Sequence, residues 1–253
     1  MPGTAIITGA SSGIGKAFVK ALLDSPGCPD SIWIIARRLD RLEELSSLSS
    51  RIVPVQADLI SEAGIQTVKE RLINEKPGVS LLINCAGMGR RGDIKDRPSS
   101  EISDVIALNC TSLSVLTREV IPYMTQGSSV INIASSAAFL PQPGFTVYAA
   151  SKSYVVSFSR ALAVELKKSG ISVTCVCPGP VNTEFNSLAT DGASTEFKGF
   201  RKLLAADAGK LASASLKAAS HKRRLFVYGF SQKALHAASK FLPTGAILGL
   251  IYR

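Results

Sequence analysis

Two side chains that can form an acid–base pair, Tyr148 and Lys152, stand near the middle of the sequence. They are four residues apart, so on a helix they project from the same face about one turn apart. A phenol beside an ammonium group is a candidate for moving a proton to or from a substrate. Such pairs also occur on many solvated helices, so the pair carries weight only together with its surroundings. Ser135, thirteen residues before the tyrosine, is the first of these surrounding residues.

A glycine-rich turn near the N-terminus indicates a second site. Residues 4–8 form a short apolar run typical of a buried strand, and residues 16–23 have helical spacing. Between them lies the turn Thr8-Gly9-Ala10-Ser11-Ser12-Gly13-Ile14-Gly15. Missing side chains let a pyrophosphate approach the backbone N–H groups at the start of a helix. The turn therefore predicts a dinucleotide-binding protein.

Strands and helices are predicted to alternate along the chain. The predicted strands are continuously apolar, which is typical of a parallel sheet covered on both faces. We therefore predict a Rossmann-like, doubly wound α/β fold, in which the carboxyl ends of the strands form the binding crevice. Ser135 follows such a strand, which places it beside the helix that begins at Tyr148. Strands are predicted at residues 4–8, 31–36, 51–56, 79–84, 128–134, 171–177 and 224–228, and helices at 16–23, 40–48, 63–74, 100–124 (interrupted near its end by Pro122), 148–168 and 205–220.

Over residues 4–185 the sequence strongly resembles the short-chain dehydrogenase/reductase family. The spacing of the glycine turn and the segment from Ser135 to Lys152 carry the resemblance. It implies that Tyr148 is the general acid in reduction and the general base in oxidation. Lys152 would lower the pKa of the tyrosine and bind the nicotinamide ribose, and Ser135, rather than the adjacent Ser136, would hold the substrate oxygen. Asn109 matches the asparagine that distorts a helix and holds a water linking the lysine to solvent.

The same resemblance implies a set of cofactor-binding residues. Arg37 and Arg38 follow the second strand where an acid would favour NAD(H), so NADP(H) is expected rather than NAD(H). Asp58 resembles the acid that contacts the adenine, although a strand-end cap is the alternative. Cys85 departs from the family's N-N-A-G motif, and we expect a structural thiol there. The other expected contacts are the turn residues Thr8, Gly9, Ser11, Ser12, Gly13, Ile14 and Gly15, then Asn84, Ala86 and Gly87, then Tyr148 and Lys152, and finally Pro178, Gly179, Val181 and Thr183.

Length and composition favour one catalytic domain over residues 1–253. The five cysteines show no disulfide framework, and the start of the sequence lacks the features of a secretion signal. No apolar run reaches the roughly 18 residues of a spanning helix. We therefore expect a cytoplasmic protein. Cys175 and Cys177 share a strand face but have no further ligands nearby, so no metal site is expected.

The net charge of +10 is carried by the end of the chain. Residues 198–253 contain 11 Lys or Arg and one acid, Asp207, whereas residues 1–197 are balanced. Residues 185–253 are predicted to hold the substrate-recognition segment and a tail helix capped by Ser231, with an apolar stripe from Ala234 to Leu242. Pro243 and Gly245 are expected to break that helix. Three interpretations stay open: packing on the cleft or a neighbouring subunit, attraction of an acidic substrate or carrier, and peripheral contact with an anionic membrane. No nucleic-acid module is recognisable.

The expected substrate is a small carbonyl compound or the corresponding alcohol. Four apolar residues hint at a lipid-like or acyl ligand: Phe185, Leu188, Phe197 and Phe200. The resemblance also implies a homodimer or homotetramer that pairs through helices 100–124 and 148–168. Two alternatives are a catalytically silent NADP sensor, disfavoured by the intact acid–base pair, and a sugar-nucleotide epimerase or dehydratase, disfavoured by the chain length.

Overall fold

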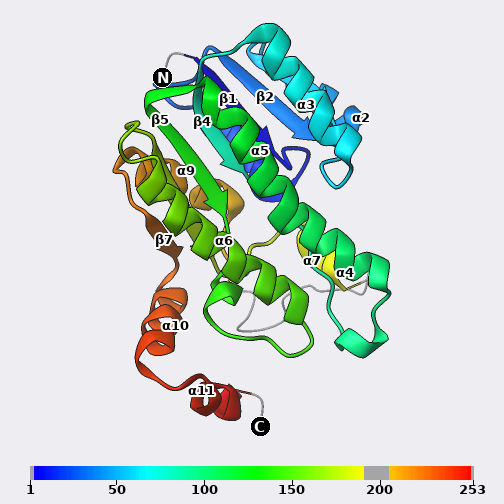
Figure 1. Ribbon diagram of the computed structural model, residues 1–253, viewed down its shortest axis with the longest axis vertical. Coiled ribbons are helices and arrows are strands. Elements are labelled where there is room, and N and C mark those ends of the chain that lie inside the picture. The colour runs from blue at the N-terminus through cyan, green and yellow to red at the C-terminus, as the bar shows by residue number, and fades with distance from the viewer. Residues whose placement is uncertain (1–2, 191–204, 252–253) are drawn as a thin grey trace.

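A computed structural model describes residues 3–190 and 205–251 of the protein. In these ranges seven strands form one parallel sheet in the order β3-β2-β1-β4-β5-β6-β7 (Figure 1). The chain starts in the middle, moves outward to β3 and returns to the other side of β1 at β4. This switch point leaves a crevice at the carboxyl ends of β1 and β4. The strands are β1 (Thr4–Thr8), β2 (Ser31–Ala36), β3 (Ile52–Gln56), β4 (Val79–Asn84), β5 (Met124–Ile133), β6 (Ser172–Pro178) and β7 (Leu225–Tyr228).

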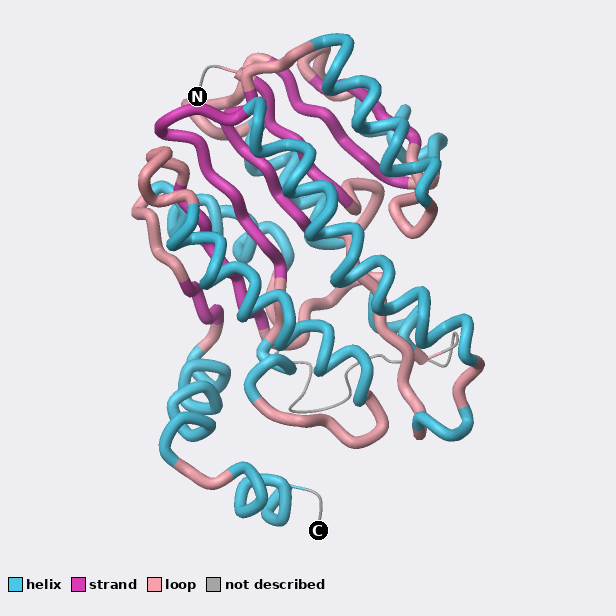
Figure 2. Tube along the Cα trace, in the orientation of Figure 1, coloured by secondary structure: helices cyan, strands magenta, loops and turns pink. Residues whose placement is uncertain are grey.

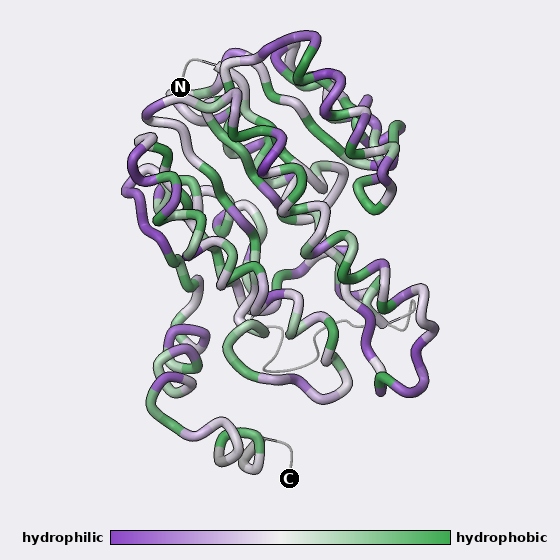
Figure 3. Tube along the Cα trace, viewed as in Figure 1, coloured by the Kyte–Doolittle hydropathy of each residue, from purple (hydrophilic) through white to green (hydrophobic). Residues whose placement is uncertain are grey.

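Helices cover both faces of the sheet, which confirms the predicted doubly wound fold. On one face α1 (Gly13–Leu23), α2 (Leu39–Ser46) and α9 (Ala208–Ser220) pack against the strands. The other face carries α3 (Glu62–Glu75), α5 (Leu113–Val120) and α6 (Thr146–Glu165). Because both faces are covered, the central strands are hydrophobic along most of their length (Figure 3). The fully buried Trp33 of β2 illustrates this, since the Arg71 guanidinium of α3 lies 4.9 Å from its ring centroid.

The segment predicted as one helix over 100–124 is divided in the structure. It comprises α4 (Ser99–Ile106), a wider π-helical turn (Ala107–Ser112), α5 and a short 3-10 turn (Ile121–Tyr123). Pro122 ends the helix as expected, because proline cannot donate an intrahelical hydrogen bond. The prediction was wrong for Met124, which is the first residue of β5. That strand starts earlier than predicted because residues 125–127 are exposed and polar and give no hydrophobic signal.

Other boundaries differ by a few residues. Helix α1 begins at Gly13 rather than at residue 16, since the low helix propensity of glycine hides the first turn. Helix α9 begins at Ala208, where the Asp207 side chain accepts a hydrogen bond from the Lys210 backbone N–H at 2.8 Å. Three more short helical segments among the described residues are α7 (Phe185–Ala189) and the 3-10 turns at Ile94–Asp96 and Ser136–Phe139.

The C-terminal tail consists of α10 (Phe230–Phe241) and α11 (Thr244–Ile251), which extend away from the sheet (Figure 2). The predicted cap at Ser231 was wrong, because Gly229 is the N-cap residue and Ser231 is already the second residue of α10. Pro243 separates the two helices as predicted, but Gly245 lies inside α11 and breaks nothing. The apolar stripe of α10 is not buried by the described residues, and Phe230 and Phe241 are 88% and 84% exposed.

Within the described ranges, no helix combines the length and the apolar character that crossing a lipid bilayer requires.

Candidate active site

A cavity of about 490 Å³ opens at the carboxyl ends of the central strands, beside the switch point. Its size is within the usual range for small-molecule sites. Most residues predicted from the sequence share this one cavity although they are far apart in the chain. The predicted residues that line it are Gly9, Ser11, Ser12, Gly13, Ile14, Gly15, Arg37, Arg38, Asp58, Ala86, Gly87, Ser135, Tyr148, Lys152, Pro178, Gly179, Val181 and Thr183.

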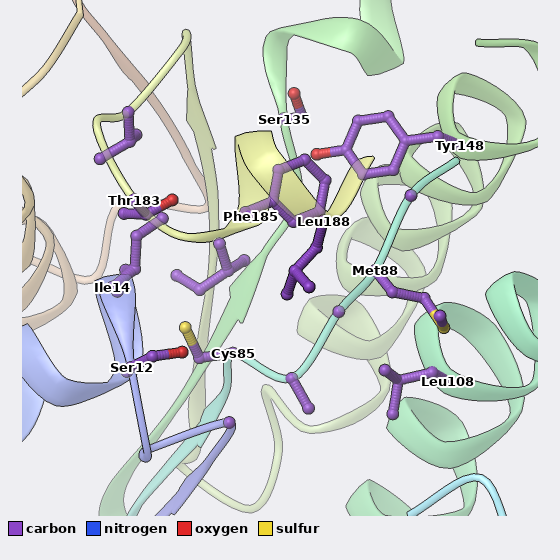
Figure 4. Close-up of a pocket in the computed structure, with 18 of the residues that line it drawn as sticks. Ser12, Ile14, Cys85, Met88, Leu108, Ser135, Tyr148, Thr183, Phe185 and Leu188 are labelled. Atoms are coloured by element: carbon purple, nitrogen blue, oxygen red, sulfur yellow. The ribbon is translucent and has the colours of Figure 1, made fainter. Parts of the chain in front are cut away.

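The glycine turn forms one wall of the cavity and leads directly into α1. Gly9 has a φ of +66°, and a Cβ atom there would lie 2.8 Å from Ala86 Cα. The residue therefore has to be glycine for the two cavity-lining segments to pack together. Ser12 precedes α1 without capping it through its side chain, and its hydroxyl points into the cavity (Figure 4). The N-terminus of α1 is consequently open toward the cavity, as an anion site requires.

Thr8 and Asn84, which were predicted to bind the cofactor, lie behind the cavity wall instead. The Thr8 hydroxyl accepts hydrogen bonds from the backbone N–H groups of Cys85 and Ala86, both at 3.0 Å. The Asn84 amide donates to Thr117 Oγ1 at 2.9 Å and to Asn132 Oδ1 at 2.8 Å. Both side chains are buried and hold the segment after β4 in place. Neither residue lines the cavity, and contact of Thr8 and Asn84 with the cofactor stays a prediction.

Ser135 and Tyr148 lie side by side at one end of the cavity, and the Tyr148 hydroxyl points toward Ser135 (Figure 4). The Ser135 hydroxyl accepts a hydrogen bond from the Ala137 backbone N–H at 3.1 Å. Ser135 follows β5, and Tyr148 projects from the first turn of α6 with 8% of its surface exposed. Burial raises the pKa of Tyr148 to about 12, against the lowering effects of the Ser135 hydrogen bond and of the Arg91 charge. At neutral pH the phenol therefore keeps its proton and is a donor.

Lys152 lies one turn further along α6 and is also buried. Its Nζ atom donates to the Ile133 carbonyl at 3.0 Å and lies 5.7 Å from the Tyr148 ring centroid. Burial lowers the pKa of Lys152, and nearby cysteine thiols oppose this effect. The sequence predicted that Lys152 lowers the pKa of Tyr148. Ser135 and Arg91 lower the pKa of Tyr148 in the structure, and burial outweighs both. The contribution of Lys152 stays a prediction.

Asn109 lies in the π-helical turn between α4 and α5, and only 1% of its surface is exposed. Its side chain accepts a hydrogen bond from the Met88 backbone N–H at 2.9 Å and donates to the Met88 carbonyl at 2.8 Å. It also donates to Ser151 Oγ of α6 at 2.9 Å. A Cβ atom at Gly87 would lie 3.2 Å from both Asn109 Oδ1 and Lys152 Nζ. Asn109 thus links three parts of the fold: the π-helical turn in which it lies, the segment after β4 and helix α6.

The end of β2 supplies positive charge to the cavity. Arg38 Nε and Nη2 donate to Ser11 Oγ at 3.3 and 3.1 Å, so the guanidinium lies against the glycine turn. Arg37 lines the same end of the cavity. Asp58 also lines it, and its Oδ1 accepts from the Ile60 backbone N–H at 3.2 Å. Asp58 therefore acts as a cap after β3 as well as being a cavity residue.

The loop after β6 closes the other side of the cavity. The Val181 carbonyl accepts a hydrogen bond from the Asn186 side chain at 2.8 Å, and Val181 forms a β-bridge with Ala206. Phe185 and Leu188 of α7 line the cavity (Figure 4). Phe197 and Phe200 lie outside the described residues.

Cys85 lines the cavity, but its thiol does not have the properties of a reactive group. Burial raises the pKa of the Cys85 thiol to about 12, which disfavours the nucleophilic thiolate. Cys175 and Cys177 share one buried face of β6 with their Sγ atoms 4.0 Å apart. Across residues 3–190 and 205–251, no three His, Cys, Asp or Glu side chains gather as a metal site would need.

Several cavity residues lie between the recognised motifs and were not predicted from the sequence. Phe145 stacks on Tyr148 with ring centroids 4.3 Å apart, and the Arg91 guanidinium lies 4.6 Å from the Phe145 ring centroid. Arg90, Gln142 and Met88 also line the cavity. Two adjacent arginines, Arg90 and Arg91, shortly after β4 were the feature of the sequence that could have indicated these cavity residues. Their spacing matches no motif, so only the folded chain places them beside Tyr148.

The cavity fits a nicotinamide dinucleotide in the kinds of groups that it presents. The open N-terminus of α1 and its glycine turn suit a pyrophosphate, Arg37 and Arg38 suit a further phosphate, and Lys152 suits a ribose hydroxyl. Tyr148 and Ser135 provide hydroxyls for a substrate oxygen. The fold and this cavity together define a Rossmann-type nucleotide-binding protein.

Comparison with known proteins gives the family. The family model for short chain dehydrogenases matches residues 3–193. A 3-oxoacyl-[acyl-carrier-protein] reductase from Chlamydia pneumoniae is 29% identical over 196 residues, which cover 76% of this chain and 79% of the relative. A sulfoacetaldehyde reductase from Chromohalobacter salexigens is 32% identical over 198 residues, which cover 74% and 76%.

A solved structure agrees with these relatives. The short-chain dehydrogenase from Sphingobium yanoikuyae in complex with NADPH superposes with a TM-score of 0.79 at 29% identity and covers 99% of this chain and 95% of its own. The chain therefore belongs to the short-chain dehydrogenase/reductase family, whose members are nicotinamide-dependent oxidoreductases acting on alcohol and carbonyl groups.

Proposed function

We propose that this protein is an NADP(H)-dependent oxidoreductase that reduces a ketone or aldehyde, or oxidises the corresponding secondary alcohol. The observation that carries the proposal is the arrangement of Ser135, Tyr148 and Lys152, which share one cavity with the glycine turn. The bound nicotinamide supplies or accepts the hydride. The protein's own residues bind the substrate oxygen and move the proton.

In the reducing direction, Tyr148 donates its phenolic proton to the carbonyl oxygen as the carbonyl carbon gains the hydride. The O–H bond of Tyr148 breaks, a new O–H bond forms on the substrate, and Tyr148 is left as a phenolate. The raised pKa of Tyr148 supports the donor role at neutral pH. Ser135 donates a hydrogen bond to the same oxygen and stabilises the charge that develops there. In oxidation the proton moves back to Tyr148.

Lys152 and Asn109 support this step in different ways. The buried Lys152 ammonium binds the nicotinamide ribose, and its charge stabilises the phenolate once the proton has left. Through three hydrogen bonds, Asn109 holds the chain at Met88 and helix α6 in a fixed position relative to each other. We propose that it also holds the water that connects Lys152 with solvent.

The cofactor preference follows from the end of β2. Arg37 and Arg38 present guanidinium groups where an acid would instead bind both ribose hydroxyls, so the 2′-phosphate of NADP(H) is the better ligand. Solved relatives hold either cofactor, NADPH in the Sphingobium protein and NADH in a reductase from Brucella melitensis, so the proposed preference rests on the two arginines. Pro178, Gly179, Val181 and Thr183 form the wall that we assign to the nicotinamide.

A fairly apolar or acyl-type substrate fits best. Phe185 and Leu188 line the cavity near Tyr148, whose ring centroid lies 5.3 Å from that of Phe185. The relatives act, by their names, on a 3-oxoacyl carrier and on sulfoacetaldehyde, and both substrates carry a reducible carbonyl. A silent NADP sensor is disfavoured because it has no need of a buried phenol and ammonium. The single-domain organisation over 1–253 and the cytoplasmic location stay predictions.

Self-association through α5 and α6 also stays a prediction, and their exposed apolar side chains support it. Val115, Tyr154 and Val164 are 38%, 43% and 61% exposed on these helices. The exposed stripe of α10, with Lys233 and Lys240 nearby, leaves contact with a neighbouring subunit or an anionic membrane as alternatives.

The function is tested by following NADPH and NADH consumption with a panel of aliphatic, aromatic and acyl-type ketones and aldehydes. We expect turnover with NADPH for at least one apolar carbonyl, and a much higher kcat/KM for NADPH than for NADH. Arg38→Ala should lower kcat/KM for NADPH about tenfold or more and leave the NADH value nearly unchanged, because it removes a charge-assisted phosphate contact.

The matched control is Arg51→Ala, which removes an equally positive but exposed side chain near the amino end of β3, away from the cavity. It should change neither kcat/KM value. Equal use of both cofactors by the wild-type protein would contradict the NADP(H) assignment. Consumption of neither with the whole panel, despite cofactor binding, would favour the sensor alternative.

A further inference from the structure

A carboxylate from the loop after β6 lies between two arginines that follow β2. Glu184 Oε2 accepts a hydrogen bond from Arg38 Nη1 at 3.0 Å, and Glu184 Oε1 accepts one from Arg41 Nη1 at 2.6 Å. Glu184 is 146 positions from Arg38 and 143 from Arg41 in sequence, so the ion pairs connect two separate segments of the fold. Glu184 is not part of any motif found in the sequence.

The two arginines form a built site for an anion. Arg38 already uses its other nitrogens, because Nε and Nη2 donate to Ser11 Oγ against the glycine turn. Arg41 stands about one turn further along α2, so it adds a second guanidinium beside the first. The hydrogen bonds from Arg41 and Arg38 lower the pKa of Glu184, so the side chain is a carboxylate at neutral pH. The Glu184 carboxylate therefore neutralises part of the positive charge that Arg38 and Arg41 bring to this end of the cavity.

We propose that Glu184 is a specificity-determining residue that competes with the 2′-phosphate of the cofactor for Arg38 and Arg41. The inference rests on the proposed function, since it takes Arg38 as the binding group for that phosphate. A phosphate carries up to two negative charges and binds the same guanidinium donors as a carboxylate does. Both anions cannot occupy these donors at once, and their charges repel each other at close range.

The two ion pairs of Glu184 are partly exposed to solvent, so another anion can displace the carboxylate from the arginines. Glu184 is 44% exposed, and its partners Arg38 and Arg41 are 38% and 35% exposed, so solvent screens the attraction. The phosphate can therefore take the site, but the nearby carboxylate weakens its binding. Glu184 accordingly lowers affinity for a 2′-phosphorylated ligand without affecting a ligand that lacks this group.

Glu184 connects the phosphate end of the cavity with the chain segment at its substrate end. Glu184 is the residue directly before α7, whose first residue, Phe185, lies against Tyr148. The segment that carries Phe185 and Leu188 is held separately, because the Asn186 side chain donates to the Val181 carbonyl and the Arg91 backbone N–H donates to the Ala189 carbonyl.

Isothermal titration with two cofactor fragments tests the inference independently of turnover. The fragments are 2′,5′-ADP and 5′-AMP, which differ only in the 2′-phosphate. Glu184→Gln keeps the size of the side chain and removes its charge. We expect this variant to bind 2′,5′-ADP about fivefold more tightly than the wild type does, with unchanged affinity for 5′-AMP.

Glu44→Gln is the matched control, because Glu44 is an exposed carboxylate of α2 that pairs with Lys16 rather than with Arg38 or Arg41. It should leave both affinities unchanged. If the wild type prefers 2′,5′-ADP but Glu184→Gln binds it equally or more weakly, Glu184 orients the arginines and only this inference is overturned. Equal tightening of both fragments also overturns it. If the wild type and Glu184→Gln each bind 2′,5′-ADP and 5′-AMP with the same affinity, the NADP(H) preference is overturned as well.

Discussion

Replacing Tyr148 by phenylalanine is expected to lower kcat for carbonyl reduction about 10³-fold, within the usual range for loss of a general acid. The phenol is buried beside Ser135, and its raised pKa keeps it protonated at neutral pH, as the proposed proton donor must be. Phenylalanine keeps the ring that stacks on Phe145. The affinity for NADPH should therefore stay nearly unchanged. Steady-state kinetics together with a fluorescence titration of NADPH measure both quantities.

Tyr154→Phe is the matched control, since it removes a phenolic hydroxyl from the same helix. Tyr154 is 43% exposed, and its hydroxyl lies 2.7 Å from Ser114 Oγ, outside the cavity. The control should keep wild-type turnover. A Tyr148→Phe enzyme with more than about a tenth of wild-type kcat would exclude Tyr148 as the principal proton donor.

The second large effect is expected for Lys152→Met, which should lower kcat about 10²-fold or more and weaken NADPH binding. The same change should leave the free energy of unfolding equal to or above the wild-type value. Lys152 is a buried cation, and no carboxylate among the described residues forms an ion pair with it. Methionine fills a similar volume without the cost of burying a charge. Denaturant unfolding and enzyme kinetics on the same samples give both results.

Lys168→Met tests whether the effect depends on position. Lys168 is exposed just after the end of α6, so its replacement should alter neither turnover nor NADPH affinity. A Lys152→Met variant that is clearly less stable than the wild type would assign Lys152 a structural role. Retained stability with lost activity is the combination that a functional, energetically costly residue produces.

The sheet could be predicted from the sequence because its physical signals are local. A parallel sheet covered on both faces requires continuously apolar strands, and the strand from Ser31 to Ala36 shows this directly. The glycine turn could be predicted as well, because it stands between a strand and a helix, where a pyrophosphate site needs it. The predicted element boundaries were wrong where the local conformational preference is weak, as at Gly13 and at the exposed start of β5.

The details of the site depended on tertiary contacts that no local pattern contains. Thr8 and Asn84 belong to recognisable motifs, but only the fold shows that their side chains hold the wall rather than line it. Arg91 changes the electrostatics of Tyr148 from a loop without a motif. The burial of Tyr148, which sets the direction of its pKa shift, likewise comes from packing against Phe145 and Phe185.

The most direct test is a crystal structure of the protein with bound NADP⁺. The nicotinamide C4 atom is expected beside the Tyr148 hydroxyl with room for a substrate carbon at reacting distance, about 3–3.5 Å from C4. The Lys152 ammonium is expected to donate to the nicotinamide ribose, and the pyrophosphate to lie on the glycine turn. A nicotinamide ring bound outside this cavity, or a Tyr148 hydroxyl turned away from it, would contradict the assignment as a redox catalyst.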